Sequence, residues 1–185
     1  MLLLCSLVFG LVLSIVIQSE AQESRELSGP YAVSGTKVCT GHWKGDSPTD
    51  PLYIQVATAT YSGTCNYSGL TESCVFIFDE TVTYPKDPSL VVTDFYEVTQ
   101  EMSYSLSRNG SYSSHTVSTP TGVMNGVYNF EIITTLRSNG HVSKNNETII
   151  IHGSQAVITH WVESPFEGYT QLYQDCHWSA TLTGI

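Results

Sequence analysis

Apolar and polar residues alternate along most of this chain. In residues 92–106 the even positions carry the apolar residues Val92, Tyr96, Val98, Met102, Tyr104 and Leu106, while the odd positions are mostly Thr, Glu and Ser. Residues 74–84 and 127–136 show the same period of two. That period is typical of antiparallel strands that bury one face. Beyond residue 21 we find no helical spacing of apolar residues over three turns, so we expect little helix.

Turn-forming residues separate the alternating segments. Asn109-Gly110 and Asn139-Gly140 are favoured in hairpin turns, and Asn145-Asn146 and Gly153-Ser154 indicate further reversals. This spacing predicts roughly eight or nine strands. We therefore expect an all-β fold, a single antiparallel up-and-down β-barrel, with a β-sandwich as the alternative.

The N-terminal region differs from the rest of the chain. Residues 1–17 are almost continuously apolar, and small residues follow at Ser19 and Ala21. We predict a signal peptide over residues 1–21, with an uncleaved membrane anchor as the alternative. Residues 22–36 are polar, contain Gly and Pro and show no period, so we predict a flexible N-terminal arm. The antiparallel β-barrel domain would then span residues 37–185.

Charge limits the choice of partners. The formal net charge is −10, and the seven Lys and Arg residues are scattered along the sequence. A nucleic acid or an anionic membrane is bound by clustered basic residues, so we expect neither as a partner once the signal peptide is removed.

The cysteines predict two disulfides. Cys5 lies within the predicted signal peptide, and four cysteines remain, an even number that leaves three connectivities open. The residues between Cys65 and Cys74 are polar, with a central glycine, as in a short loop, so we predict that these two pair. Cys39 would then pair with Cys176 and join the first strand to the last. No tight Cys/His spacing indicates a metal site.

Three Asn-x-Ser/Thr sequons begin at Asn66, Asn109 and Asn146. Each lies in a polar context that favours a turn. In a secreted chain, three such sites indicate that at least one carries a glycan.

Two tryptophan segments resemble a known superfamily. Residues 39–43, Cys-Thr-Gly-His-Trp, resemble the Gly-x-Trp signature on the first strand of the calycin barrels, the lipocalins and avidins. Residues 61–64 resemble the start of the next avidin strand, and Trp178 falls where an avidin places a late pocket tryptophan. This resemblance implies a barrel whose closed end is covered by Trp43. The ligand-holding residues of the middle avidin strands have no match here, so biotin binding is not implied. A lipocalin has a helix before its last strand, and this sequence shows none there.

Several polar residues lie among apolar residues on the predicted inward faces, notably Glu80, Asp94 and Gln100. A buried polar group needs a partner. These residues therefore lie near water at strand ends, or they line a pocket and hold a polar ligand such as an amine. Our candidate ligand-binding residues are Trp43, Glu80, Asp94, Tyr96, Gln100, Tyr128 and Trp178.

No catalytic motif is present, so we expect a protein that is not an enzyme and needs no cofactor. We predict a secreted glycoprotein that binds a small apolar or amine ligand inside a β-barrel. The alternative is an extracellular protein-recognition or structural β-sandwich glycoprotein without a pocket.

Each tryptophan follows a histidine, and neighbours on a strand face opposite sides, so inward tryptophans imply outward histidines.

Overall fold

A computed structural model describes residues 25–44, 47–132, 137–161 and 170–185 of this chain. The predicted signal peptide, residues 1–21, lies outside the described residues. The regular secondary structure of the described residues is all β-strand, which confirms the all-β prediction. The strands are β1 (Gly29–Trp43), β2 (Gln55–Ser68), β3 (Thr71–Tyr84), β4 (Asp87–Leu106), β5 (Ser111–Thr116), β6 (Thr121–Met124), β7 (Tyr128–Ile132), β8 (Arg137–Val142), β9 (Thr148–Trp161) and β10 (Thr170–Gly184).

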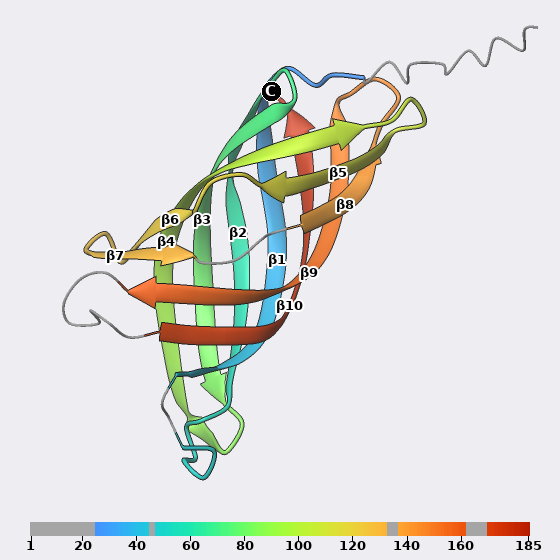
Figure 1. The fold of residues 1–185 in the computed structure, drawn as a ribbon. Coiled ribbons are helices and arrows are strands. Elements are labelled where there is room, and N and C mark those ends of the chain that lie inside the picture. Colours follow the sequence, from blue (N-terminus) through green and yellow to red (C-terminus); the bar gives the residue numbers. More distant parts are fainter. Residues whose placement is uncertain (1–24, 45–46, 133–136, 162–169) are drawn as a thin grey trace, which may run out of the picture.

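The described strands form one antiparallel sheet, and their hydrogen-bonded pairings close into a cycle (Figure 1). The order along the cycle is β1, β2, β3, β4, β5, β8, β9 and β10, and β10 pairs with β1 again. The predicted neighbourhood of the first and last strands is therefore confirmed. Within the described ranges, no helix is long and apolar enough to span a membrane.

The cycle closes with a stagger in register. From Thr36 on β1, one direction leads through Thr60 and Asp79 to Phe95. The other direction leads through Ser179, His152, Asn139 and Ser113 to Ser105. Both end points lie on β4, and they differ by ten residues (105 − 95 = 10). A stagger of this kind arises when a sheet closes with its strands tilted.

Two short strand pairs fill the gap between β4 and β9 (Figure 1). The C-terminal part of β4 pairs with β5, and β8 continues from β5 to the N-terminal part of β9. An earlier part of β4 pairs with β6, and β7 continues from β6 to the C-terminal end of β9. The wall between these two long strands is thus built from two pieces, one above the other along β4.

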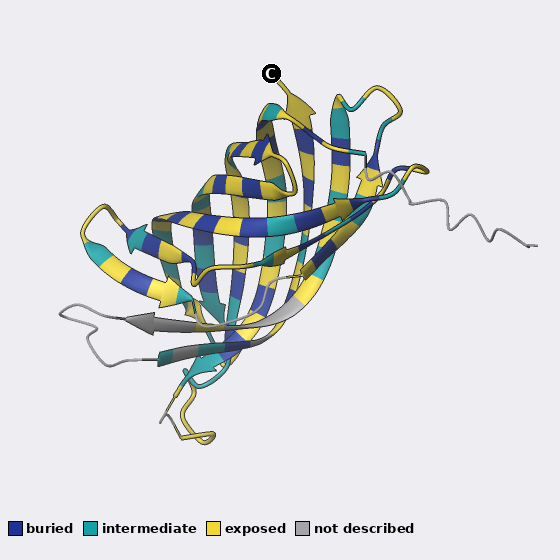
Figure 2. Ribbon diagram, turned by 45° about the horizontal axis from the view of Figure 1, so that its top comes forward, coloured by how far each residue is buried: buried dark blue, intermediate teal, exposed yellow. Residues whose placement is uncertain are grey.

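Buried and exposed residues alternate along the strands (Figure 2). The even positions of β4 from Tyr96 to Leu106 are buried as predicted. Two predicted turns are wrong, because Asn139-Gly140 lies inside β8 and Gly153-Ser154 lies inside β9. Gly153 allows close packing there, since a Cβ on it would lie 2.5 Å from the indole of Trp178.

The N-terminal boundary also differs from the prediction. β1 begins at Gly29, so residues 29–36 belong to the sheet and not to a flexible arm. Tyr31 and Val33 are each 4% exposed and alternate with outward Ala32 and Ser34. The glycines and proline of this segment had concealed that alternation, because such residues usually end strands.

Both predicted disulfides are confirmed. Cys39 and Cys176 are register partners of β1 and β10, and they are bonded with a Cα–Cα distance of 4.0 Å. Cys65 and Cys74 face each other across the β2–β3 hairpin, and their Cα atoms lie 4.1 Å apart. All four cysteines are buried, and the pair of disulfides fits an extracellular protein.

Candidate functional site

A cavity lies inside the cycle of strands. About 90 Å³ of it is open to the centres of water-sized molecules, whereas ~10–15 Å³ on this scale holds one water. Its wall is mainly apolar and includes Val33, Phe76, Phe78, Val98, Met102 and Leu182. A few polar side chains interrupt this wall, as in sites that bind small molecules.

Lys37 is the cation of the cavity wall. Its ammonium lies 5.4 Å from the ring centroid of Phe78 and 5.9 Å from that of Tyr96, and it donates a long hydrogen bond of 3.4 Å to the Tyr96 hydroxyl. Its register neighbour on β2 is Ala59, which is small enough to let the lysine side chain extend toward β3 and β4. Burial lowers the pKa of Lys37, and the negative charge of Glu80 partly opposes this shift.

Glu80 and Tyr96 connect to this lysine. The Tyr96 hydroxyl donates to Glu80 Oε2 over 2.9 Å, and Glu80 is 7% exposed. Burial, together with the charge and hydrogen bond of Glu80, raises the pKa of Tyr96. We call Lys37, Tyr96 and Glu80 the lysine group. A carboxylate therefore balances the lysine charge through an intervening tyrosine.

Trp178 lies beside Lys37, because the two are register partners of β10 and β1. Both line the cavity, and the indole of Trp178 packs over Gly153 of β9. The indole Nε1 is buried and has no hydrogen-bond acceptor among the described residues. Such an unsatisfied donor is rare in a protein interior and costs free energy.

A second polar group surrounds Glu72, which is 2% exposed and also lines the cavity. Tyr112 donates to Glu72 Oε1 over 2.7 Å, and the hydroxyls of Tyr67 and Ser114 also hydrogen-bond this carboxyl. Burial raises the pKa of Glu72 more than these hydrogen bonds lower it. We call Glu72, Tyr112, Tyr67 and Ser114 the glutamate group.

The other candidate residues are divided between the cavity and its surroundings. Gln100 lines the cavity and is 8% exposed, and its Nε2 donates to the sulfur of Met102. Asp94 is half-buried and accepts a 3.4 Å hydrogen bond from Asn125. Trp43 and Tyr128 are half-buried against an apolar cluster that includes Phe130, and they do not belong to the cavity wall.

Of the expected site residues, Tyr96, Gln100 and Trp178 line the cavity. Glu80 does not line it but accepts the hydrogen bond of the Tyr96 hydroxyl. Sequence reasoning missed Lys37 and Glu72. Lys37 lies at an odd-numbered position of β1, like the buried residues Tyr31, Val33 and Cys39, and therefore points inward. This pattern can be recognised only when the strand is taken to begin at Gly29. Glu72 was read as part of a loop, whereas it lies on β3.

Of the two histidine–tryptophan pairs whose side chains are described, one follows the predicted geometry, and in the other both residues are half-buried. The His177 side chain is exposed beside Asp175, and Trp178 faces the cavity. His42 is half-buried and stacks on Tyr53, with a ring-centroid distance of 4.7 Å. The side chains of His160 and Trp161 lie outside the described residues.

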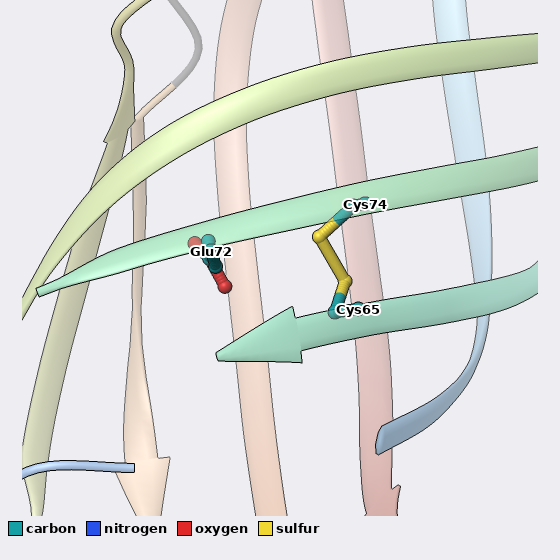
Figure 3. A group of neighbouring side chains, drawn as sticks. All are labelled: Cys65, Glu72 and Cys74. Atoms are coloured by element: carbon teal, nitrogen blue, oxygen red, sulfur yellow. A yellow bond between two sulfur atoms is a disulfide. The ribbon is translucent and has the colours of Figure 1, made fainter. Parts of the chain in front are cut away.

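Cys65, Glu72 and Cys74 lie close enough to resemble a metal site, since their ligand atoms are within 4.8 Å of one another (Figure 3). Both sulfurs, however, are joined in the disulfide. Metal binding needs thiolates, so this group cannot supply sulfur ligands while the bond is intact.

The sequons differ in exposure. Asn66 on β2 and Asn109 in the β4–β5 turn are exposed. Asn146 is half-buried in the turn before β9, and its Oδ1 is buried without a hydrogen-bond partner among the described residues. Asn66 and Asn109 are therefore the more accessible asparagines.

Comparison with known proteins adds no assignment, because neither a protein-family model nor a curated protein matches this chain. Its function has to be argued from its own residues.

Proposed function

We propose that this chain is a secreted β-barrel protein that binds a small, largely apolar ligand in its internal cavity. The observation that carries the proposal is an apolar cavity, lined from several strands, that contains a few defined polar groups. The cyclic pairing and the ten-residue stagger support the closed barrel, because a tilted barrel requires both. One continuous sheet favours this reading over a sandwich of two sheets.

Two classes of ligand fit an apolar pocket of this kind. The first is an apolar molecule with a polar group at one end. The second is an apolar amine, and the observation in its favour is the buried carboxyl of Glu72 in the cavity wall. Trp178 lines the cavity and so gives either class a spectroscopic reporter.

The proposal is tested by ligand binding to a variant with a filled cavity. Ala180 lines the cavity and is 5% exposed, so Ala180→Leu should narrow it. Ala32→Leu, on the outward face of β1, is the matched control. In a thermal-shift screen of apolar compounds, a ligand at 100 times its Kd should stabilise the protein by about 2.7 kcal/mol.

We expect the control to keep this shift and Ala180→Leu to lose most of it. No shift with any compound, or equal shifts in both variants, would leave the cavity without a ligand-binding role.

Secretion and glycosylation are part of the same proposal. Two buried disulfides and exposed sequons at Asn66 and Asn109 support them. When the protein is produced in a eukaryotic secretory pathway, glycosidase treatment should increase its gel mobility. Asn66→Gln and Asn109→Gln, separately and together, should then show which site carries the glycan, and unchanged mobility would contradict glycosylation.

A further inference from the structure

We infer that the ligand presents a neutral oxygen acceptor, such as a ketone or ester oxygen, to Lys37 and Trp178. Apolar amines are then the wrong class of ligand for this cavity. The inference rests on the proposed ligand binding and specifies its chemistry.

Within the described part of the chain, the cavity wall has hydrogen-bond donors that lack acceptors. An ammonium has three N–H groups, and among the described residues Lys37 makes one hydrogen bond, the 3.4 Å contact with Tyr96. The indole N–H of its register partner Trp178 has no acceptor there at all. Both side chains line the cavity: the lysine ammonium extends toward Phe78 and Tyr96, and the indole Nε1 lies against Gly153 of β9. An oxygen acceptor on a ligand would satisfy one or both of them.

The charges around these donors favour a neutral acceptor. Glu80 already balances Lys37 through Tyr96. An anionic ligand would leave one ammonium between two negative charges, that of the ligand and that of Glu80. An amine would bring a second positive charge beside Lys37. Like charges in a medium of low dielectric constant repel strongly, so both ionic classes are disfavoured.

Glu72 does not provide an alternative position for an amine. Its carboxyl already accepts hydrogen bonds from Tyr112, Tyr67 and Ser114. An incoming ammonium would have to share this carboxyl with these hydroxyls, the nearest of which, that of Tyr112, already lies 2.7 Å from Oε1. The buried carboxyl that favours an amine in this cavity is therefore already hydrogen-bonded within the fold.

The test compares three ligands that have eight carbons each and differ in the polar group: hexyl methyl ketone, octylamine and octanoate. Calorimetric titration at neutral pH should show the ketone binding about tenfold more tightly than either ionic compound, which corresponds to ~1.4 kcal/mol. Tighter binding of octylamine or octanoate would overturn the inference while the proposed function stands. No binding of any of the three would remove both.

Variants identify the donors. Lys37→Met combined with Glu80→Gln removes the donor together with its counter-charge, and it should weaken ketone binding about tenfold or more. Trp178→Phe keeps a ring and removes only the N–H, and it should weaken ketone binding about threefold to tenfold. Lys86→Met, at an exposed lysine in the β3–β4 turn, is the matched control and should change nothing.

Trp178→Phe keeps the test decisive if the double variant does not fold. Ketone affinity that is unchanged in a folded Trp178→Phe protein and in a folded double variant would overturn the inference. Unchanged affinity in Trp178→Phe alone, when the double variant is unfolded, would also overturn the inference that Lys37 and Trp178 both donate to the ligand.

Discussion

The lysine group and the glutamate group both lie inside the cycle of strands, yet their hydrogen bonding differs. In the glutamate group, hydroxyls of the fold itself donate to the buried carboxyl, and that of Tyr112 lies 2.7 Å from it. In the lysine group, the charge is balanced by Glu80, but among the described residues the ammonium makes a single hydrogen bond, to Tyr96, and it belongs to the cavity wall. A satisfied network stabilises a fold, whereas unsatisfied donors around a cavity are suited to a ligand.

Register explains why the two groups are separate. Glu80 and Lys37 lie on one row of the sheet, joined through Ala59 on β2. Glu72 lies near the β2–β3 hairpin, directly opposite Tyr67 on β2 and Met102 on β4. The glutamate group therefore joins the hairpin to β5, and the lysine group occupies the middle of the long strands.

The largest effect is expected when the charge balance of the lysine group is broken. Glu80→Ala leaves the Lys37 ammonium without its counter-charge, and it should lower the free energy of unfolding by about 3–5 kcal/mol. The double variant Lys37→Met/Glu80→Gln removes both charges, and its free energy of unfolding should be much closer to that of the wild type. Urea denaturation measures both values. Equal losses in the two variants would show that the charge pair is not the cause.

A smaller loss is expected in the glutamate group. Tyr112→Phe removes the donor that lies 2.7 Å from Glu72 Oε1, and it should cost about 1.5–3 kcal/mol, as for hydrogen bonds to charged groups. Tyr53→Phe, at a half-buried tyrosine outside both groups, is a suitable control for the loss of a hydroxyl. Urea denaturation should give a lower free energy of unfolding for Tyr112→Phe than for Tyr53→Phe. Equal free energies of unfolding would contradict the role of Tyr112.

The pH dependence of stability should also distinguish the groups. Burial raises the pKa of Glu72 above its usual value of 4.5, so the folded state holds its proton more tightly than the unfolded state. The resulting stabilisation is present below about pH 4.5 and is lost as the pH rises through the folded pKa. The contribution of this group falls by at most ~1.4 kcal/mol per pH unit in that window.

Glu72→Gln cannot titrate at this position, so its free energy of unfolding should gain on the wild type as the pH rises above about 4.5. Chemical denaturation at several pH values measures this difference. A constant difference between variant and wild type would contradict the raised pKa of Glu72.

The sequence predicted the fold class and part of the site because both depend on local alternation. The period of two identified the inward faces of β3 and β4, including Glu80, Tyr96 and Gln100. The cysteine spacing predicted a hairpin disulfide and a bond between the terminal strands, and both are present. These features require only neighbouring residues or a simple topology.

Other features depend on distant residues and could not be predicted in this way. Gly153 resembled a turn residue, but it serves the close approach of Trp178 from β10. The polar character of Lys37 and Glu72 gave no sign of burial, because their partners Tyr96 and Tyr112 lie far along the chain. Which polar groups are satisfied depends on the full register of the strands.

The most direct test of ligand binding in the cavity is an NMR titration of the tryptophan indole N–H signals. The chain has three tryptophans, and Trp178→Phe assigns the signal of Trp178 by its loss. On addition of hexyl methyl ketone, the Trp178 signal should move downfield as its N–H gains an acceptor, while the Trp43 signal, outside the cavity wall, stays nearly fixed. A Trp178 signal that does not move at saturating ketone would contradict the account.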